Sequence, residues 1–186
     1  CLYILWQLTV ALIVAGGVIG YLLASKVEMT QMPELVAGMH ALVGLAAVFV
    51  GFNAHFELAN VLGMDSSAKK ALEGFAALLA KKSAVEINIL RVEASLGIWI
   101  GAVTFTGSVI AYGKLAGKVT SKATKLPGGH ILNAIAAISS LACLVWYLNS
   151  GELLPLGILT VLALFIGCHL IMGIGGADMP VVVSML

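Results

Sequence analysis

The chain has 186 residues and a formal net charge of +1, with 61% hydrophobic residues, 10% charged residues and a mean hydropathy of +1.08. Soluble domains carry about 25% charged residues, so these charges are too few to cover a globular surface. There is no basic run of the kind that binds nucleic acid, and the three cysteines lack the spacing of a metal site. The composition predicts an all-α, polytopic transmembrane helix bundle.

Five apolar runs predict five membrane spans, because a helix needs about 20 apolar residues to cross a bilayer. In chain order we expect the spans at about 2–25, 33–56, 92–112, 130–147 and 154–174. Residues 180–186 are expected to start a sixth span, and Pro33 suits the first turn of the second. The chain begins with Cys1 and stops inside an apolar run, so we expect 1–186 to be a single transmembrane domain and a fragment of a longer protein.

The links between the spans predict the orientation. Residues 57–91 are expected to form a long outer loop, with a helical pattern that places Leu72, Phe75, Leu78 and Leu79 on one face. That pattern fits either an amphipathic helix at the membrane surface or a solvated loop helix. Lys26 and the four lysines of 114–125 balance the five basic residues of 57–91. Because long loops weigh less in the positive-inside rule, we place Lys26 and the 114–125 loop inside.

Small residues follow one face of the second and third expected spans. Gly44 and Gly51 recur at helical spacing in the second, and Gly97 and Gly101 do so in the third. Small faces let membrane helices approach closely, so this pattern by itself indicates packing.

His40 lies inside the second expected span, where an ionisable residue is costly and usually functional. An imidazole can take up and release a proton near neutral pH. The alternative is a structural histidine whose ring is satisfied by a neighbouring carbonyl.

Depth favours a set of polar residues in two pairs. His40 lies seven residues after the start of its span, and Ser108 lies six residues before Lys114. On antiparallel helices both would lie roughly 10 Å from the inside end. Asn53 and Glu93 also fall level with each other, near the outer end. Two polar pairs at two depths resemble stations of a hydrated path, although spacing alone supports the match and chance is the alternative.

Asp178 lies two residues before Pro180, at the expected start of the sixth span and on the inside. It fits either a helix cap or a mobile carboxylate that senses a partner. Gly175 and Gly176 would let this connection change shape. His169 lies deep in the fifth span without a polar neighbour one turn away, whereas His130 and Asn133 stand at a span start and fit an interfacial position.

Several stretches of the chain carry a resemblance to a known family. They are 26–30 (KVEMT), 32–40, 43–48, 101–108 (GAVTFTGS), 112–115 and 174–180 (IGGADMP). These stretches closely resemble the β subunit of proton-translocating NAD(P) transhydrogenase, in its transmembrane part. The last stretch is highly specific.

The resemblance implies an oxidoreductase and translocase that couples hydride transfer between NAD(H) and NADP(H) to proton translocation. By position, His40 matches the family's membrane histidine on the proton path and Ser108 a serine that faces it. Asp178 matches an aspartate near the NADP(H) domain, while Asn53 and Glu93 match polar residues toward the outer mouth.

The resemblance also implies partners, cofactors and location. Expected partners are the lipid bilayer, the α subunit with its membrane helices and NAD(H)-binding domain, and the NADP(H)-binding domain of the same subunit, with the whole enzyme a dimer. NADP(H) and NAD(H) would bind in those soluble domains, so we expect neither a cofactor nor a metal in this chain. The membrane would be the bacterial cytoplasmic membrane or the mitochondrial inner membrane.

Two other functions fit the residues. One is a fragment of a proton-coupled secondary transporter that uses His40, which should show inverted repeats with broken helices. Only the Met32–Pro33 and Met179–Pro180 pairs echo each other. The other is a non-catalytic membrane anchor packed on its glycines, which has no need of His40.

Overall fold

A computed structural model describes residues 2–65, 74–122 and 128–175 of the chain. All regular structure in these residues is helical. The elements are α1 (Leu2–Lys26), the short 3-10 turn η1 (Met29–Gln31), α2 (Met32–Gly63), α4 (Phe75–Ala80), α5 (Ala84–Leu115), α6 (Gly129–Ser150) and α7 (Leu153–Met172). Five of these helices are long and apolar enough to cross a membrane. The predicted all-α transmembrane bundle is therefore confirmed, while the expected sixth span lies outside the described residues.

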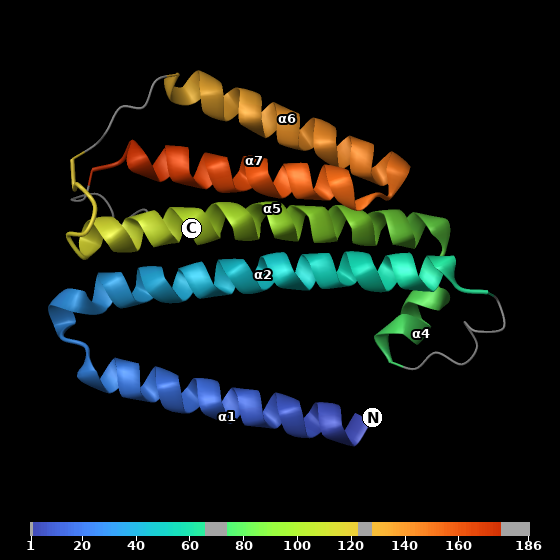
Figure 1. Ribbon diagram of the computed structural model, residues 1–186, viewed down its shortest axis with the longest axis horizontal. Coiled ribbons are helices and arrows are strands. Elements are labelled where there is room, and N and C mark those ends of the chain that lie inside the picture. The colour runs from blue at the N-terminus through green and yellow to red at the C-terminus, as the bar shows by residue number, and fades with distance from the viewer. Residues whose placement is uncertain (1, 66–73, 123–127, 176–186) are drawn as a thin grey trace.

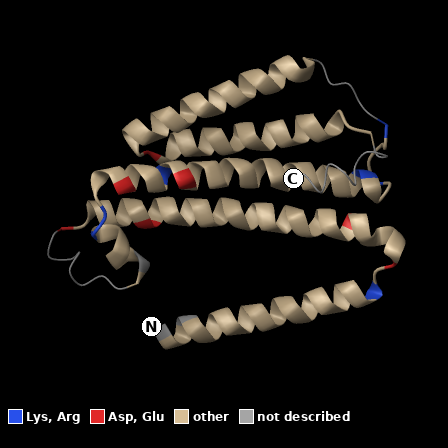
Figure 2. Cartoon of the chain, turned by 180° about the vertical axis from the view of Figure 1, so that it is seen from behind, with Lys and Arg blue, Asp and Glu red and all other residues tan. Residues whose placement is uncertain are grey.

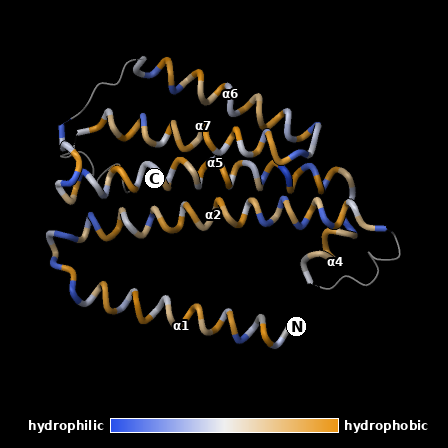
Figure 3. The backbone as a smooth tube through the Cα atoms, in the orientation of Figure 1, coloured by the Kyte–Doolittle hydropathy of each residue, from blue (hydrophilic) through white to orange (hydrophobic). Residues whose placement is uncertain are grey.

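Four of the long helices form a row (Figure 1), in which α5 is antiparallel to α2, α7 runs parallel to α5, and α6 is antiparallel to α7. Helix α2 packs on α5, α5 on α7, and α7 on α6. Helix α1 stands apart, and none of its apolar window from Trp6 to Lys26 is buried. Apolar residues run along its whole length (Figure 3), as expected of a helix whose surroundings are lipid or other membrane helices.

The link between the second and third spans is shorter than the sequence suggested. Helix α2 continues to Gly63 and α5 begins at Ala84, so both ends of the predicted 57–91 loop are helical. The start of α5 is fixed by a capping box, in which the Ser83 backbone N–H donates to Glu86 Oε2 over 2.7 Å and the Glu86 N–H donates to Ser83 Oγ.

The amphipathic pattern in this link also needs correction. The described helix there, α4, has six residues. Leu79 is buried against Leu58 and Val61 of α2, whereas Leu78 is 62% exposed. The two leucines therefore do not share a buried face, because the helix that carries them is short and docks on the end of α2 through one side.

The turn between α6 and α7 is tight, because α6 ends at Ser150 and α7 begins at Leu153. Gly151 ends α6 with a φ of 67°, a left-handed conformation that favours glycine, and its N–H donates to Tyr147 O over 2.8 Å. Arg91 of α5 reaches this turn and donates from Nη1 to Leu148 O over 3.3 Å.

Two buried clusters hold the row together. The larger includes Val48 of α2, Ile98 of α5, Cys143 of α6 and Leu159 of α7. The smaller cluster contains Ala37, Ala111 and Ile171, near the start of α2 and the ends of α5 and α7.

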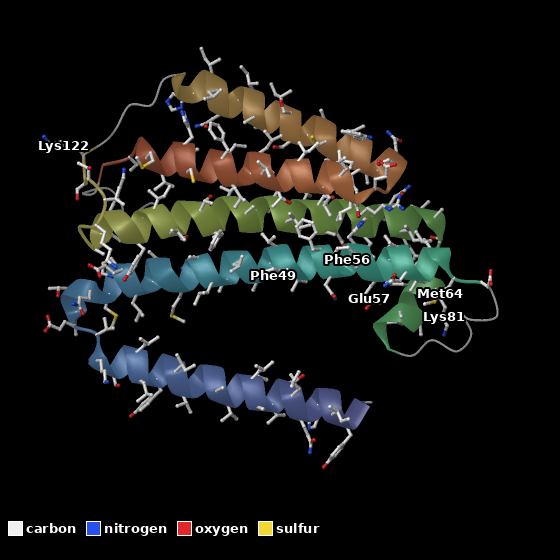
Figure 4. All side chains as sticks on the ribbon, viewed as in Figure 1. Phe49, Phe56, Glu57, Met64, Lys81 and Lys122 are labelled. Carbon is white, nitrogen blue, oxygen red and sulfur yellow. The ribbon has the colours of Figure 1, made fainter. Side chains whose placement is uncertain are left out.

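Charged residues lie toward the two ends of the bundle and leave its middle apolar (Figure 2). Lys122 marks one end, and Glu57, Met64 and Lys81 gather toward the other, beside α4 (Figure 4). The described loops thus divide between the two ends as a membrane-spanning bundle requires.

Candidate functional site

The contact between α2 and α5 shows which residues of the two helices lie at the same depth along the bundle. A Cβ atom at Gly44 would lie 2.7 Å from Gly101 O and 2.8 Å from Phe105 N. A Cβ atom at Gly38 would lie 3.9 Å from Cδ2 of Tyr112. The backbones therefore touch at Gly44, and residues 38–44 of α2 lie level with residues 105–112 of α5.

His40 and Ser108 both fall inside this level. His40 is half-buried, and its Nδ1 lies 3.0 Å from Val36 O. A carbonyl oxygen can only accept, so Nδ1 carries the hydrogen and Nε2 of the neutral ring has a free lone pair. Ser108 is fully buried, and its hydroxyl has no hydrogen-bond partner within residues 2–65, 74–122 and 128–175. The two side chains share a depth but no hydrogen bond joins them there.

Asn53 and Glu93 share a level nearer the other end. Gly51 of α2 lies against Ala94 of α5, where a Cβ atom would be 3.1 Å from Ala94 O. Both polar side chains are exposed. Glu93 borders a groove of about 360 Å³ between the two helices. The two residues are level, and no hydrogen bond joins them in the described part of the chain. Asp178 lies outside the described residues.

A buried polar contact absent from the sequence prediction links α2 to α6. Nδ1 of His55 lies 2.8 Å from the hydroxyl oxygen of Tyr147, and the side chains are 6% and 1% exposed. His55 falls in an expected apolar span, so the cost of burying an ionisable group was a signal that pointed to it.

Lys114 is the most unexpected residue of the bundle. The sequence placed it in the inside loop, but it lies in the last turn of α5 and is only 2% exposed. Its ammonium donates to the carbonyl oxygens of Ile171, Met172 and Ile174, over 3.1, 3.0 and 2.7 Å. A lysine beside an apolar run is ordinarily assigned to a loop, so its sequence position gave no warning of this burial.

Helices α5 and α7 are also joined by a threonine. Thr106 Oγ1 lies 3.0 Å from Leu164 O and 3.1 Å from Ala102 O of its own helix. A Cβ atom at Gly167 would collide with this hydroxyl, so the glycine is what allows the two helices to approach.

A second polar region lies between α6 and α7. His169 is 9% exposed, stacks on Phe165 with ring centroids 5.6 Å apart, and has neither ring nitrogen hydrogen-bonded within the described ranges. It borders a groove of about 600 Å³ together with His130 and Asn133. Within the same ranges no three His, Cys, Asp or Glu residues gather as a metal site would require.

Comparison with known proteins places this arrangement in a family. The family model for the NAD(P) transhydrogenase beta subunit matches residues 2–186. The chain belongs to the NAD(P) transhydrogenase beta-subunit family. It is 41% identical over 174 residues to the NAD(P) transhydrogenase subunit beta of Rhodospirillum rubrum, and equally to that of a named strain of the same species. Each match covers 94% of this chain and 34% of the relative, so the chain spans about a third of the length of these relatives.

Membership of the family agrees with the helices themselves. A multi-pass bundle of apolar helices is what the membrane part of a transhydrogenase beta subunit needs, and the resemblance read from the sequence is confirmed. The glycines at the end of α7 follow a helix, whereas a dinucleotide fingerprint follows a strand.

Proposed function

We propose that this chain is the proton-conducting membrane part of an enzyme that couples hydride transfer between NAD(H) and NADP(H) to proton translocation. The observation that carries the proposal is His40, a half-buried imidazole inside α2, level with the fully buried Ser108 of α5. The helix pair that presents them makes the most extensive contact between described helices, with backbone meeting backbone at Gly44.

The geometry gives His40 a defined chemistry. Its Nδ1 hydrogen is held by Val36 O, so Nε2 is the atom that takes up and releases a proton. The hydrogen bond at Nδ1 orients the ring. The Ser108 hydroxyl supplies a buried acceptor and donor at the same depth, which a water molecule or the reoriented ring can satisfy.

The second polar level extends the route toward the other end of the bundle. Asn53 and Glu93 are exposed there, and Glu93 borders a groove between α2 and α5. A proton path needs polar groups or water on both sides of its central ionisable residue. Asn53 and Glu93 supply polar groups between the level of His40 and the outer end of the bundle.

The remaining parts of the proposed enzyme are contributed from outside this chain. NAD(H) binds to a domain of an α subunit, and NADP(H) binds to a soluble domain of the β subunit itself. The α subunit also brings membrane helices, and the whole enzyme is a dimer. Asp178 passes the proton state of the path to the NADP(H) domain. The membrane is the bacterial cytoplasmic membrane or the mitochondrial inner membrane, with the Lys26 and Lys114 end inside.

The test uses the complete enzyme in sealed phospholipid vesicles. His40→Ala should reduce proton translocation and coupled transhydrogenation together by about 100-fold, the lower range for losing an acid–base group. The KM for NAD(H) should stay unchanged, because the NAD(H) domain is separate from the membrane path. His130→Ala is the matched control, since His130 is an exposed histidine at a helix start.

Two results would overturn the proposal. Wild-type rates of proton translocation in His40→Ala would make His40 a structural histidine. Proton movement that depends on a small solute and ignores both nucleotides would instead identify a proton-coupled transporter.

A further inference from the structure

The buried ammonium of Lys114 uses all of its hydrogen-bonding capacity on one helix end. A lysine carries three N–H donors, and the three carbonyl oxygens it meets belong to Ile171, Met172 and Ile174. The C-terminus of a helix leaves carbonyls without intrahelical partners and carries a partial negative charge. The contact therefore satisfies both the buried cation and the end of α7.

This contact adjoins a cluster at which three helices meet, because Ile171 belongs to both. Ala37 of α2, Ala111 of α5 and Ile171 of α7 form one buried cluster. Ala37 precedes His40 by three residues, and Ala111 follows Ser108 by three. At this end of the bundle, the last turn of α7 therefore packs against both α2, which carries His40, and α5, which carries Ser108.

The same turn leads into the connection that carries Asp178. The last carbonyl held by Lys114 is that of Ile174, the residue before Gly175. The turn itself is closed by the Ile174 N–H, which donates to Ile171 O over 3.2 Å. Lys114 therefore fixes where α7 ends relative to α5, and hence where the connection begins.

Resting on the proposed function, we propose that Lys114 is a positioning residue for coupling. It holds the end of α7 in register with the helices of His40 and Ser108, so that a change at their level is carried to the connection that starts at Gly175. The residue acts through these carbonyls and takes no proton from the path.

The experiment compares variants of the complete enzyme in vesicles. Lys114→Met keeps an unbranched side chain of similar length but removes the charge and the hydrogen-bond donors. Lys114→Gln keeps hydrogen-bond donors without the charge, and Lys114→Arg keeps both the donors and the charge. Lys118→Met is the control, because Lys118 is exposed four residues further on. For each variant the folded fraction, the protons moved per hydride transferred, and the dissociation constant for NADP(H) are measured.

Per folded enzyme, Lys114→Met should lower the number of protons moved per hydride. It should also change NADP(H) affinity by about fivefold or more, a usual size for coupling between sites. Affinity for NAD(H) should not change. The defects should diminish in the order Met, Gln, Arg, and Lys118→Met should behave as wild type. If Lys114→Met does not fold, the comparison of Gln with Arg carries the same test.

Lost protein with unchanged coupling and unchanged NADP(H) affinity would make Lys114 a helix cap and overturn the inference. The inference would also be overturned if the Gln and Arg variants both moved as many protons per hydride as the wild type. If His40→Ala is defective while all Lys114 variants are normal, only this inference fails and the proposed function stands. If His40→Ala is also normal, the proposed function itself has failed.

Discussion

Nδ1 of His55 and the hydroxyl oxygen of Tyr147 lie 2.8 Å apart, and their rings meet at 5.5 Å between centroids. The contact joins α2 to α6, although α5 and α7 lie between these helices in the row (Figure 1). It is reached because Tyr147 is long and because it inserts into the cluster around Ile98 and Leu156. The half of the bundle beside α4 is thus held by a buried polar pair as well as by apolar packing.

Removing the tyrosine hydroxyl tests this pair. Tyr147→Phe keeps the ring but leaves the buried His55 Nδ1 without its partner. We expect the purified protein in detergent to lose about 1–3 kcal/mol of stability, the usual cost of an unsatisfied buried polar group. Tyr112→Phe is the control, because Tyr112 is 37% exposed and its hydroxyl makes no hydrogen bond within the described residues. Equal melting temperatures for the two variants would show that the His55 contact is not a source of stability.

The close contact of α2 and α5 gives a second prediction. A Cβ atom at Gly44 would meet backbone atoms of Gly101 and Phe105, which cannot turn aside as a side chain can. Gly44→Ala should therefore separate the helices and cost about 1–3 kcal/mol, as overpacking does. Thermal unfolding in detergent measures this loss. Gly97→Ala adds the same methyl group where nothing lies within 4 Å, and it should leave the melting temperature unchanged.

The apolar runs and the glycine faces predicted the helices and the closeness of α2 and α5, because hydropathy and small side chains act locally. The ends of the helices were not predicted correctly. Glu57 and Arg91 were assigned to a loop, since charged residues mark the end of an apolar run, yet both lie in helices that continue past the run. The capping box of Ser83 and Glu86 was a sequence signal that could have located the start of α5.

The polar contacts between helices were beyond the sequence for a different reason. His55 and Tyr147, or Lys114 and the end of α7, are far apart in the chain and meet only because α5, α6 and α7 pack in one particular order. Depth can be counted along a helix, so His40 could be matched with Ser108. Which way a side chain turns around the helix depends on the neighbouring helices, and a count along the chain does not contain it.

Ser108 gives a prediction in which stability and activity separate. Its hydroxyl is buried without a hydrogen-bond partner among the described residues, so Ser108→Ala should leave stability unchanged or raise it. Coupled proton translocation in vesicles should nevertheless fall, though less than in His40→Ala, because water can replace part of the hydroxyl's role. Ser95→Ala is the control. Ser95 is equally buried on the same helix but donates to Arg91 O over 2.7 Å, so its loss should affect stability and spare translocation. Normal translocation in Ser108→Ala would remove this serine from the path.

The last prediction concerns Asp178, four residues beyond the Ile174 carbonyl that Lys114 holds. Asp178→Asn nearly keeps the shape of the side chain and removes its charge. If the carboxylate carries the proton state of the path to the NADP(H) domain, the variant should fold normally, pump fewer protons per hydride, and change NADP(H) affinity by about fivefold or more. Proton uptake and NADP(H) release in vesicles measure both effects. Asp65→Asn, just beyond the other end of α2, should change neither. Wild-type values for Asp178→Asn in both assays would reduce Asp178 to the cap expected for a sixth span, because an asparagine caps a helix as well as an aspartate does.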